Sequence, residues 1–188
     1  MSAWDLPTAA EIGGTTYGIR SDYRAALDIL TLMADPELTD GERGALALEV
    51  LYPGIADMPP EHYGEAASFL QWFVAGGDAG ASPPRRKLAD WNQDFLIIAP
   101  PVSRVLGFEV RSVEYLHWWT FLGAYMEVGD CLFAQVVAIR KKKSQGKKLE
   151  KHEREFYRDN RELVDFHVTR TDAEKEILDE WIGGVDNG

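Results

Sequence analysis

The pattern of apolar and polar residues predicts a chain that is mostly helical. In most segments apolar residues recur every three or four positions, as expected for helices that bury one face. The predicted helices span residues 23–34, 40–52, 60–75, 88–99, 115–126, 131–140, 149–167 and 171–182. Ahead of them, two short β-compatible pieces flank a Gly-Gly pair within residues 11–19 and predict a hairpin that must pack on the helices. The expected fold class is therefore mainly α, a single-domain helical bundle with a short N-terminal β-hairpin.

Local signals place several helix ends. Asp22 can cap the first helix, and Thr39 with Glu42 has the spacing of a capping box at the start of the second. Ser112 is the expected cap of the helix at residues 115–126. The pair Pro100-Pro101 is expected to break or kink the chain after the fourth helix. The helix at residues 149–167 has few apolar and many charged positions, which predicts a peripheral element.

Residues 115–126 are the densest aromatic and apolar block of the chain. Their bulky side chains fall on every side of a helical wheel, which predicts a central helix packed nearly all round. His117 lies inside this block. A single histidine among aromatic residues is interpreted as a hydrogen-bonded core residue rather than a catalytic group.

Asp90 and Asp94 lie one helical turn apart in the predicted helix at residues 88–99. Paired carboxylates can perform acid–base chemistry or bind a divalent cation, but no third carboxylate or histidine lies at helical spacing. We therefore predict that Asp90, Asp94 and His117 form a structural polar set that ties two helices together. The expected structural core motif comprises Asp90, Trp91, Asp94, His117, Trp118, Trp119 and Phe121.

Length and composition favour one domain. The chain has 188 residues, 45% of them hydrophobic, which is enough to bury a core. Residues 1–20 are expected to form an N-terminal arm or short hairpin, residues 21–182 a helical domain with a flexible loop at 75–87, and residues 183–188 a disordered tail. The single cysteine, Cys131, excludes an internal disulfide framework and is interpreted as a small buried hydrophobic residue. With no secretory signal and no apolar run near the roughly 20 residues that span a bilayer, the expected location is cytosolic.

Charge is unevenly distributed along the sequence. The net charge is −11, yet eight basic residues against two glutamates fall between Arg140 and Arg154. This run could meet phosphates or an acidic protein face, although a solvated helix end is the simpler interpretation. No aromatic residue interleaves the run, which disfavours a platform for single-stranded nucleic acid. The candidate electrostatic contacts are Arg140, Lys141, Lys142, Lys143, Lys147 and Lys148.

Motifs for catalysis or cofactor binding are missing. His152-Glu153 begins like a zinc HExxH motif, but Phe156 occupies the position of the second histidine. The four histidines show no metal-ligand spacing, and neither a Walker sequence nor a nucleophile elbow is present. We therefore expect no enzymatic activity, no cofactor and no metal.

Six segments, taken in order, form a pattern that is typical of one protein family. They are Asp22-Tyr23-Arg24, Asp35-Pro36-Glu37-Leu38-Thr39, Leu51-Tyr52-Pro53, Asp90-Trp91-Asn92-Gln93-Asp94, Leu116-His117-Trp118-Trp119-Thr120-Phe121-Leu122 and Ala138-Ile139-Arg140-Lys141-Lys142-Lys143 with the charged helix that follows. Together they resemble the bacteriophage gene-product-fifteen family of long-tailed phages, over roughly residues 10–165. The family usually has a glutamate where this chain has Asn92, and the Gly/Pro-rich stretch at 75–84 is longer than the family pattern.

The resemblance implies a tail-morphogenesis protein encoded between the major tail protein and the tape-measure protein. Long-tailed phages place tail assembly chaperones there, which bind the helical tape-measure chain and keep it soluble until the tail tube forms. The expected partners are the tape-measure protein, other tail proteins and a second copy of this chain, with no specific nucleic acid and no membrane. The expected location is the host cytoplasm. The alternative is a structural virion component such as a tail or connector accessory subunit, followed by a nucleic-acid-binding module.

Overall fold

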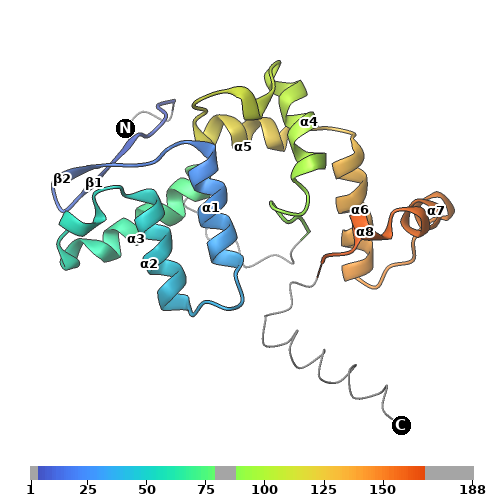
Figure 1. The fold of residues 1–188 in the computed structure, drawn as a ribbon, viewed down its shortest axis with the longest axis horizontal. Coiled ribbons are helices and arrows are strands. Elements are labelled where there is room, and N and C mark those ends of the chain that lie inside the picture. Colours follow the sequence, from blue (N-terminus) through green and yellow to red (C-terminus); the bar gives the residue numbers. More distant parts are fainter. Residues whose placement is uncertain (1–3, 79–87, 168–188) are drawn as a thin grey trace, which may run out of the picture.

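The structure, a computed structural model, describes residues 4–78 and 88–167 (Figure 1). Within these ranges the chain forms one antiparallel hairpin, eight α-helices and three 3₁₀ turns. The strands are β1 (Ala9–Ile12) and β2 (Thr15–Gly18), and the 3₁₀ turns are η1 (Ile55–Asp57), η2 (Pro60–His62) and η3 (Val110–Ser112). The helices are α1 (Tyr23–Ala34), α2 (Asp40–Leu51), α3 (Tyr63–Val74), α4 (Phe95–Leu106), α5 (Trp118–Met126), α6 (Leu132–Ser144), α7 (Lys151–Asp159) and α8 (Arg161–Val164). The expected fold class, mainly α with a short N-terminal hairpin, is confirmed.

The elements follow one another from one end of the molecule to the other (Figure 1). The hairpin and α1–α3 lie at one end, α4 and α5 in the middle, and α6–α8 at the other end. Helix α1 packs against α2 and α5, α4 packs against α5 and α6, and α8 packs against α6 and α7. The middle helices therefore join the two ends of the molecule.

The N-terminal hairpin turns at Gly13 and Gly14, as the sequence predicts. Both glycines have positive φ, +56° and +77°, which suits the tight turn that a two-residue hairpin requires. A Cβ at Gly13 would lie 2.2 Å from Nε2 of His62, so that position also needs the space of a glycine. The hairpin is held on the helices because Ala10 and Ile12 are fully buried and β1 packs against α3.

The predicted caps of α1 and α2 are confirmed. The Asp22 side chain accepts a backbone N–H in the first turn of α1, and Thr39 and Glu42 form both hydrogen bonds of a capping box. Helical spacing of apolar residues predicts a buried face of α1 made of Tyr23, Ala26, Leu27, Leu30 and Met33, and this prediction is partly wrong. Ile29 is fully buried, whereas Met33 is 47% exposed, because the face that contacts α2 and α5 is rotated from the one expected.

The predicted helix at residues 88–99 is wrong at its start. Helix α4 begins only at Phe95, and the residues before it form turns. The Asp90 carboxylate accepts two backbone N–H groups, from Asn92 and Gln93, at 2.9 and 2.8 Å. These local hydrogen bonds satisfy the backbone in a turn and so compete with a helix.

Of the break or kink expected at Pro100-Pro101, the break is wrong, because α4 continues through both prolines to Leu106. The prolines remove the N–H groups that would bond the carbonyl groups of Leu96 and Ile97. Pro100 is exposed and the Leu96 side chain is 63% exposed, so this turn of the helix lies at the surface, where water can bond a freed carbonyl.

Helix α5 contains the predicted central block but differs from the prediction in two respects. Its N-cap is His117, whose side chain accepts the backbone N–H of the second residue of the helix, and Ser112 instead ends η3. Trp118 and Phe121 are buried, yet Met126 is 74% exposed. The helix therefore packs against α1, α4 and the end of α3, while a stripe that includes Thr120, Gly123 and Met126 is open to solvent.

The predicted single helix at residues 149–167 is divided into α7 and α8 by Asn160. The Asn160 side chain donates a hydrogen bond to the Phe156 carbonyl at 2.9 Å and so satisfies a carbonyl at the end of α7. Val164 in α8 is 1% exposed. The last part of this segment is thus core rather than periphery.

Some predictions fall on residues that the structure does not describe. These are the helix at 171–182, the tail at 183–188 and most of the loop at 75–87. Across residues 4–78 and 88–167, no helix has both the length and the apolar character needed to cross a membrane.

Candidate functional site

The most deeply buried charged groups are Asp94 and Arg140, and they bind each other. The guanidinium Nη1 lies 2.5 Å from Asp94 Oδ2, and Nη2 lies 2.9 Å from Oδ1, with both side chains at most 3% exposed. The remaining donors of Arg140 bond the carbonyls of Leu88, Leu163 and Val164 at 2.7–3.1 Å. Every guanidinium N–H is therefore used, which is the condition under which a buried charge pair is tolerated.

Arg140 corrects one prediction from the sequence. It was a candidate for electrostatic contact with a partner, but its burial removes it from the surface. The spacing of Arg140 in the sequence could have indicated that it is buried. Phe133, Val136 and Arg140 share one face of α6, and the first two are core residues. An arginine on an apolar face needs a buried carboxylate, and Asp94 supplies it.

His117 belongs to a different polar set. Its Nδ1 accepts the Trp119 backbone N–H at 3.0 Å, so Nε2 carries the proton and donates to the Pro7 carbonyl at 2.9 Å. Asp94 does contact Asp90, whose backbone N–H donates to Asp94 Oδ2 at 2.9 Å. The predicted grouping of Asp90, Asp94 and His117 is therefore wrong for His117, which ties α5 to the N-terminal segment.

The two tryptophans of the core motif join α5 to the end of α3. The indole N–H of Trp118 donates to the Val74 carbonyl at 3.1 Å, and that of Trp119 donates to the Phe73 carbonyl at 2.8 Å. Trp118 is 1% exposed, while Trp119 is half-buried. These bonds satisfy carbonyls at the C-terminal end of α3, so their role is structural.

Trp91 and Phe121, the other aromatic members of the core motif, lie in the middle of the molecule. The Trp91 ring is 6.3 Å from the Phe121 ring and 4.9 Å from the Tyr125 ring, measured between centroids. Burial and the neighbouring Asp94 raise the pKa of Tyr125 to about 12, so its phenol stays neutral. This aromatic contact attaches the turn before α4 to α5.

Part of the basic run is neutralised within the molecule. Lys142 lies 2.6 Å from Glu153 and 3.6 Å from Glu150, and it therefore bridges the end of α6 to the start of α7. The hydrogen bond to Glu153 raises the pKa of Lys142, and the same bond lowers the pKa of Glu153. Lys143 pairs with Asp165.

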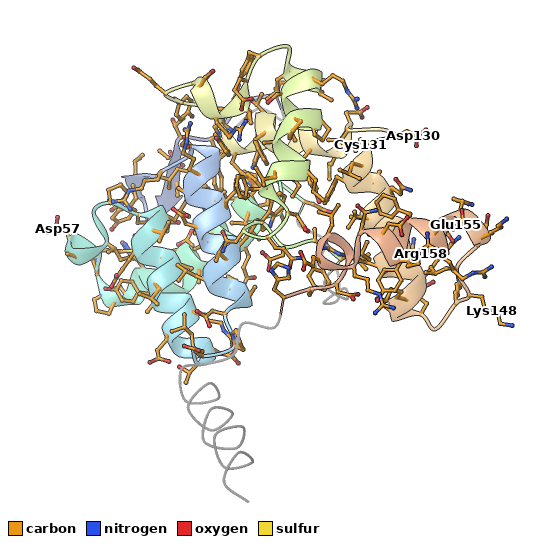
Figure 2. The ribbon with its side chains drawn as sticks, turned by 45° about the vertical axis from the view of Figure 1, so that its right-hand side comes forward. Asp57, Asp130, Cys131, Lys148, Glu155 and Arg158 are labelled. Carbon is orange, nitrogen blue, oxygen red and sulfur yellow. The ribbon has the colours of Figure 1, made fainter. Side chains whose placement is uncertain are left out.

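The other lysines of the run face solvent. Lys141, Lys147 and Lys148 are exposed, and the side chain of Lys148 extends away from the body of the molecule (Figure 2). None of the three forms an ion pair with a described residue. Of the six predicted contact residues, these three present an unneutralised charge at the surface.

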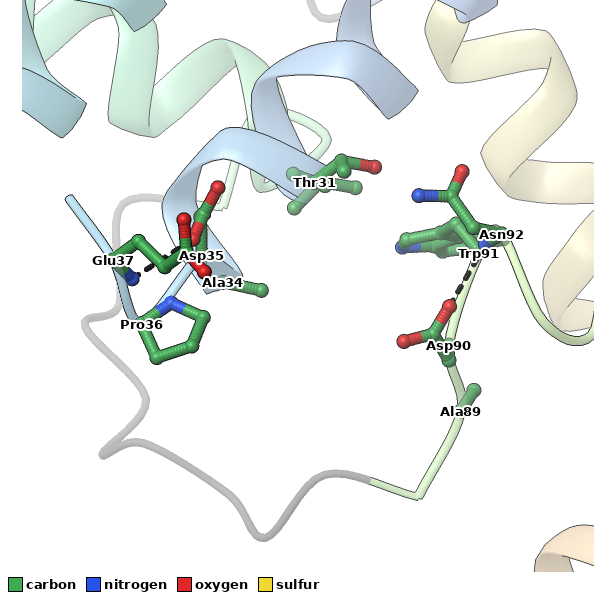
Figure 3. A pocket seen from close by; sticks show the side chains of 10 residues that line it. Thr31, Ala34, Asp35, Pro36, Glu37, Ala89, Asp90, Trp91 and Asn92 are labelled. Carbon is green, nitrogen blue, oxygen red and sulfur yellow. Dashed lines mark hydrogen bonds between the residues drawn. The ribbon is translucent and has the colours of Figure 1, made fainter. Parts of the chain in front are cut away.

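An acidic cleft of about 580 Å³ lies between the end of α1 and the turn before α4 (Figure 3). Its walls contain three carboxylates and one indole, which suit a cationic group more than an anionic or apolar one. Sequence reasoning did not find it, because its two walls lie far apart along the chain. The lining residues are Leu30, Thr31, Ala34, Asp35, Pro36, Glu37, Ala89, Asp90, Trp91 and Asn92.

A second hollow, of about 420 Å³, lies between α4 and the start of α6 and is mostly apolar. Leu96 is 63% exposed and Leu132 is 45% exposed, and the one charged residue in the lining is Arg104. Cys131 also lines it. Its Sγ accepts the Ala134 N–H at 3.4 Å as the N-cap of α6, so Cys131 is a half-buried cap rather than the buried hydrophobic residue expected. We refer to this hollow, lined by Leu96, Ile97, Pro100, Pro101, Arg104, Cys131 and Leu132, as the apolar groove.

Among residues 4–78 and 88–167, no three His, Cys, Asp or Glu side chains come together as a set that could hold a metal ion. The two buried groups that invited a catalytic interpretation, Asp94 and His117, have their polar atoms committed to structural hydrogen bonds.

Comparison with known protein families gives a match over most of the chain. A family model described as Bacteriophage Gp15 protein matches residues 4–76 and 107–166. The matched ranges contain the Leu116–Leu122 and Ala138–Lys143 segments, whereas residues 90–94 lie between them. No curated protein and no solved structure matches the chain.

Proposed function

This chain belongs to the Bacteriophage Gp15 protein family, and from that premise we propose that it is a tail assembly chaperone that binds the tape-measure protein. Membership makes it a phage protein. The chaperone role and the choice of partner are our proposal, supported by the surface of the molecule and by the role that the family resemblance implies.

The apolar groove is the observation that carries the proposal. A tape-measure chain is long and helical, so before it is enclosed by the tail tube its apolar faces need cover. A groove between two helices can accept the apolar face of a third, with leucines as contacts and a charged residue at the rim. Leu96, Leu132 and Arg104 provide this arrangement.

The overall charge is compatible with this role. A net charge of −11 favours solubility through mutual repulsion, which a chaperone must confer on an aggregating partner. The proposed role needs no catalytic step. It is compatible with the hydrogen bonds of Asp94 to Arg140 and of His117 to the Pro7 carbonyl, which hold the fold together.

Two glutamate substitutions in the apolar groove test the proposal. Leu96 and Leu132 lie in the first turns of α4 and α6, where the helix dipole favours a negative charge, so Leu96→Glu and Leu132→Glu should fold. Met126→Glu is the matched control, because Met126 is 74% exposed and lies outside the groove. Each variant is co-expressed with the tape-measure protein, and the amount that co-purifies is measured.

We expect the amount of tape-measure protein that co-purifies with each groove variant to fall at least about tenfold relative to the wild type. The reason is that burying one leucine contributes about 1.5–3 kcal/mol. The Met126→Glu control should match the wild type. Wild-type recovery by both groove variants would refute binding through the groove. Stoichiometric amounts of the protein in purified mature virions, measured by mass spectrometry, would favour the structural alternative.

A further inference from the structure

The two ends of the molecule carry opposite charge. Residues 4–78 contain 3 Lys/Arg against 13 Asp/Glu, whereas residues 131–167 contain 10 Lys/Arg against 6 Asp/Glu. Figure 1 places the first set, with α1–α3, at the opposite end from the second, with α6–α8. A molecule of this kind presents complementary surfaces to other copies of itself.

On the basic side, the charge gathers where α6 turns into α7. We define the basic tip as Lys141, Lys147, Lys148 and Lys151, which are all exposed and form no ion pair with a described residue. Lys142 holds the two helices together beneath it through Glu150 and Glu153. These ion pairs fix the connection between α6 and α7 on which the basic tip lies.

On the acidic side, α1 and the turn that follows it carry three carboxylates that have no cationic partner among the described residues. We define the acidic surface as Asp28, Asp35 and Glu37. Asp28 is an exposed residue of α1, Asp35 is the C-cap of the same helix, and Asp35 and Glu37 border the cleft of Figure 3. Helix α1 has no basic residue in its last turn, so its carbonyl end adds to the negative potential.

We propose that the basic tip of one copy docks against the acidic surface of a second copy, so that copies associate head to tail. The two surfaces differ, which makes the contact heterologous and leaves each pair with one unused tip and one unused acidic surface. Such a contact can extend into a row of copies. This inference rests on the charge distribution and does not depend on the proposed function.

Reciprocal charge reversal tests the contact in the full-length protein. One variant carries Asp28→Lys and Glu37→Lys, and the other carries Lys147→Glu and Lys148→Glu. The matched control carries Asp57→Lys and Glu61→Lys, which change the charge equally at exposed sites outside the acidic surface. Sedimentation velocity is measured over a range of protein concentration at about 0.01 M and 0.15 M salt, where the Debye lengths are roughly 30 and 8 Å.

We expect the wild type and the control to associate at low salt and to dissociate at high salt. Each reversal variant alone should sediment as a monomer, and an equimolar mixture of the two should associate again, although both remain net negative. A monomeric wild type at low salt, unchanged association of the reversal variants, or equal loss in the control would each overturn the inference. So would sub-micromolar binding of wild type to duplex DNA that Lys147→Glu with Lys148→Glu abolishes.

Discussion

At the scale of single residues, the buried pair of Asp94 and Arg140 joins the turn before α4 to α6 and α8. The guanidinium donates to a carboxylate 46 positions earlier and to the carbonyls of Leu163 and Val164 at the end of α8. Such a pair contributes little compared with apolar packing when intact, but the loss of one member leaves a buried charge without compensation. A change of one partner alone should therefore destabilise the protein far more than the pair stabilises it when intact.

Asp94→Asn should destabilise the protein by about 3–5 kcal/mol, because it leaves the Arg140 charge buried and unpaired. Urea unfolding at neutral pH measures the change. Asp159→Asn is the control, because it removes a carboxylate from the exposed pair with Arg158 and should leave the midpoint nearly unchanged. Equal midpoints for Asp94→Asn and wild type would contradict the structural role.

Trp118→Ala should cost about 3–5 kcal/mol, the range for a fully buried aromatic residue, and it also leaves the Val74 carbonyl without its donor. Trp119→Ala should cost less, because Trp119 is only half-buried. Thermal melts of the two variants test the order. A larger loss for Trp119 would show that α5 packs by a different face.

At the scale of elements, the features that sequence reasoning found are local ones. The Gly13-Gly14 turn and the caps at Asp22 and Thr39 depend on neighbouring residues, and all three are confirmed. The role of Arg140 depends on its bond to Asp94, 46 positions away, which no local pattern contains. The cleft and the groove were missed for the same reason, since each lies between segments that only the tertiary fold brings together.

The junction of α6 and α7 should make a pH-dependent contribution through Lys142 and Glu153. The pKa of Glu153 is lowered, so its contribution is present above the unfolded glutamate pKa of about 4.3 and is lost as the pH falls through the folded value. The pKa of Lys142 is raised, so its own contribution is lost only at strongly alkaline pH.

Lys142→Met should therefore destabilise the protein at pH 6, and the difference from wild type should shrink at pH 3. Lys147→Met is the matched control, because Lys147 is exposed and forms no ion pair with a described residue. Urea unfolding at both pH values gives the comparison. A difference that is constant with pH would mean that Lys142 stabilises the junction by packing alone.

At the scale of the whole molecule, the proposed binding surfaces are spatially separate. The apolar groove is at the start of α6 and the basic tip is at its end, and 13 residues of helix separate them by roughly 18 Å. That separation exceeds two Debye lengths at 0.15 M salt, about 8 Å each, but is shorter than the roughly 30 Å at 0.01 M. The charge of the tip can therefore influence binding at the groove only when the salt concentration is low.

Neutralising the tip should accordingly affect the encounter with the tape-measure protein more than the final complex. Replacing Lys141, Lys147 and Lys148 with glutamine should modestly lower the amount of tape-measure protein that co-purifies at about 0.01 M salt. At about 0.15 M salt that amount should be unchanged. The Leu96→Glu variant should lose co-purification at both salt concentrations, because apolar contacts are not screened. If the glutamine variant fails at 0.15 M as completely as Leu96→Glu, the tip itself is part of the bound interface and the groove alone does not account for recognition.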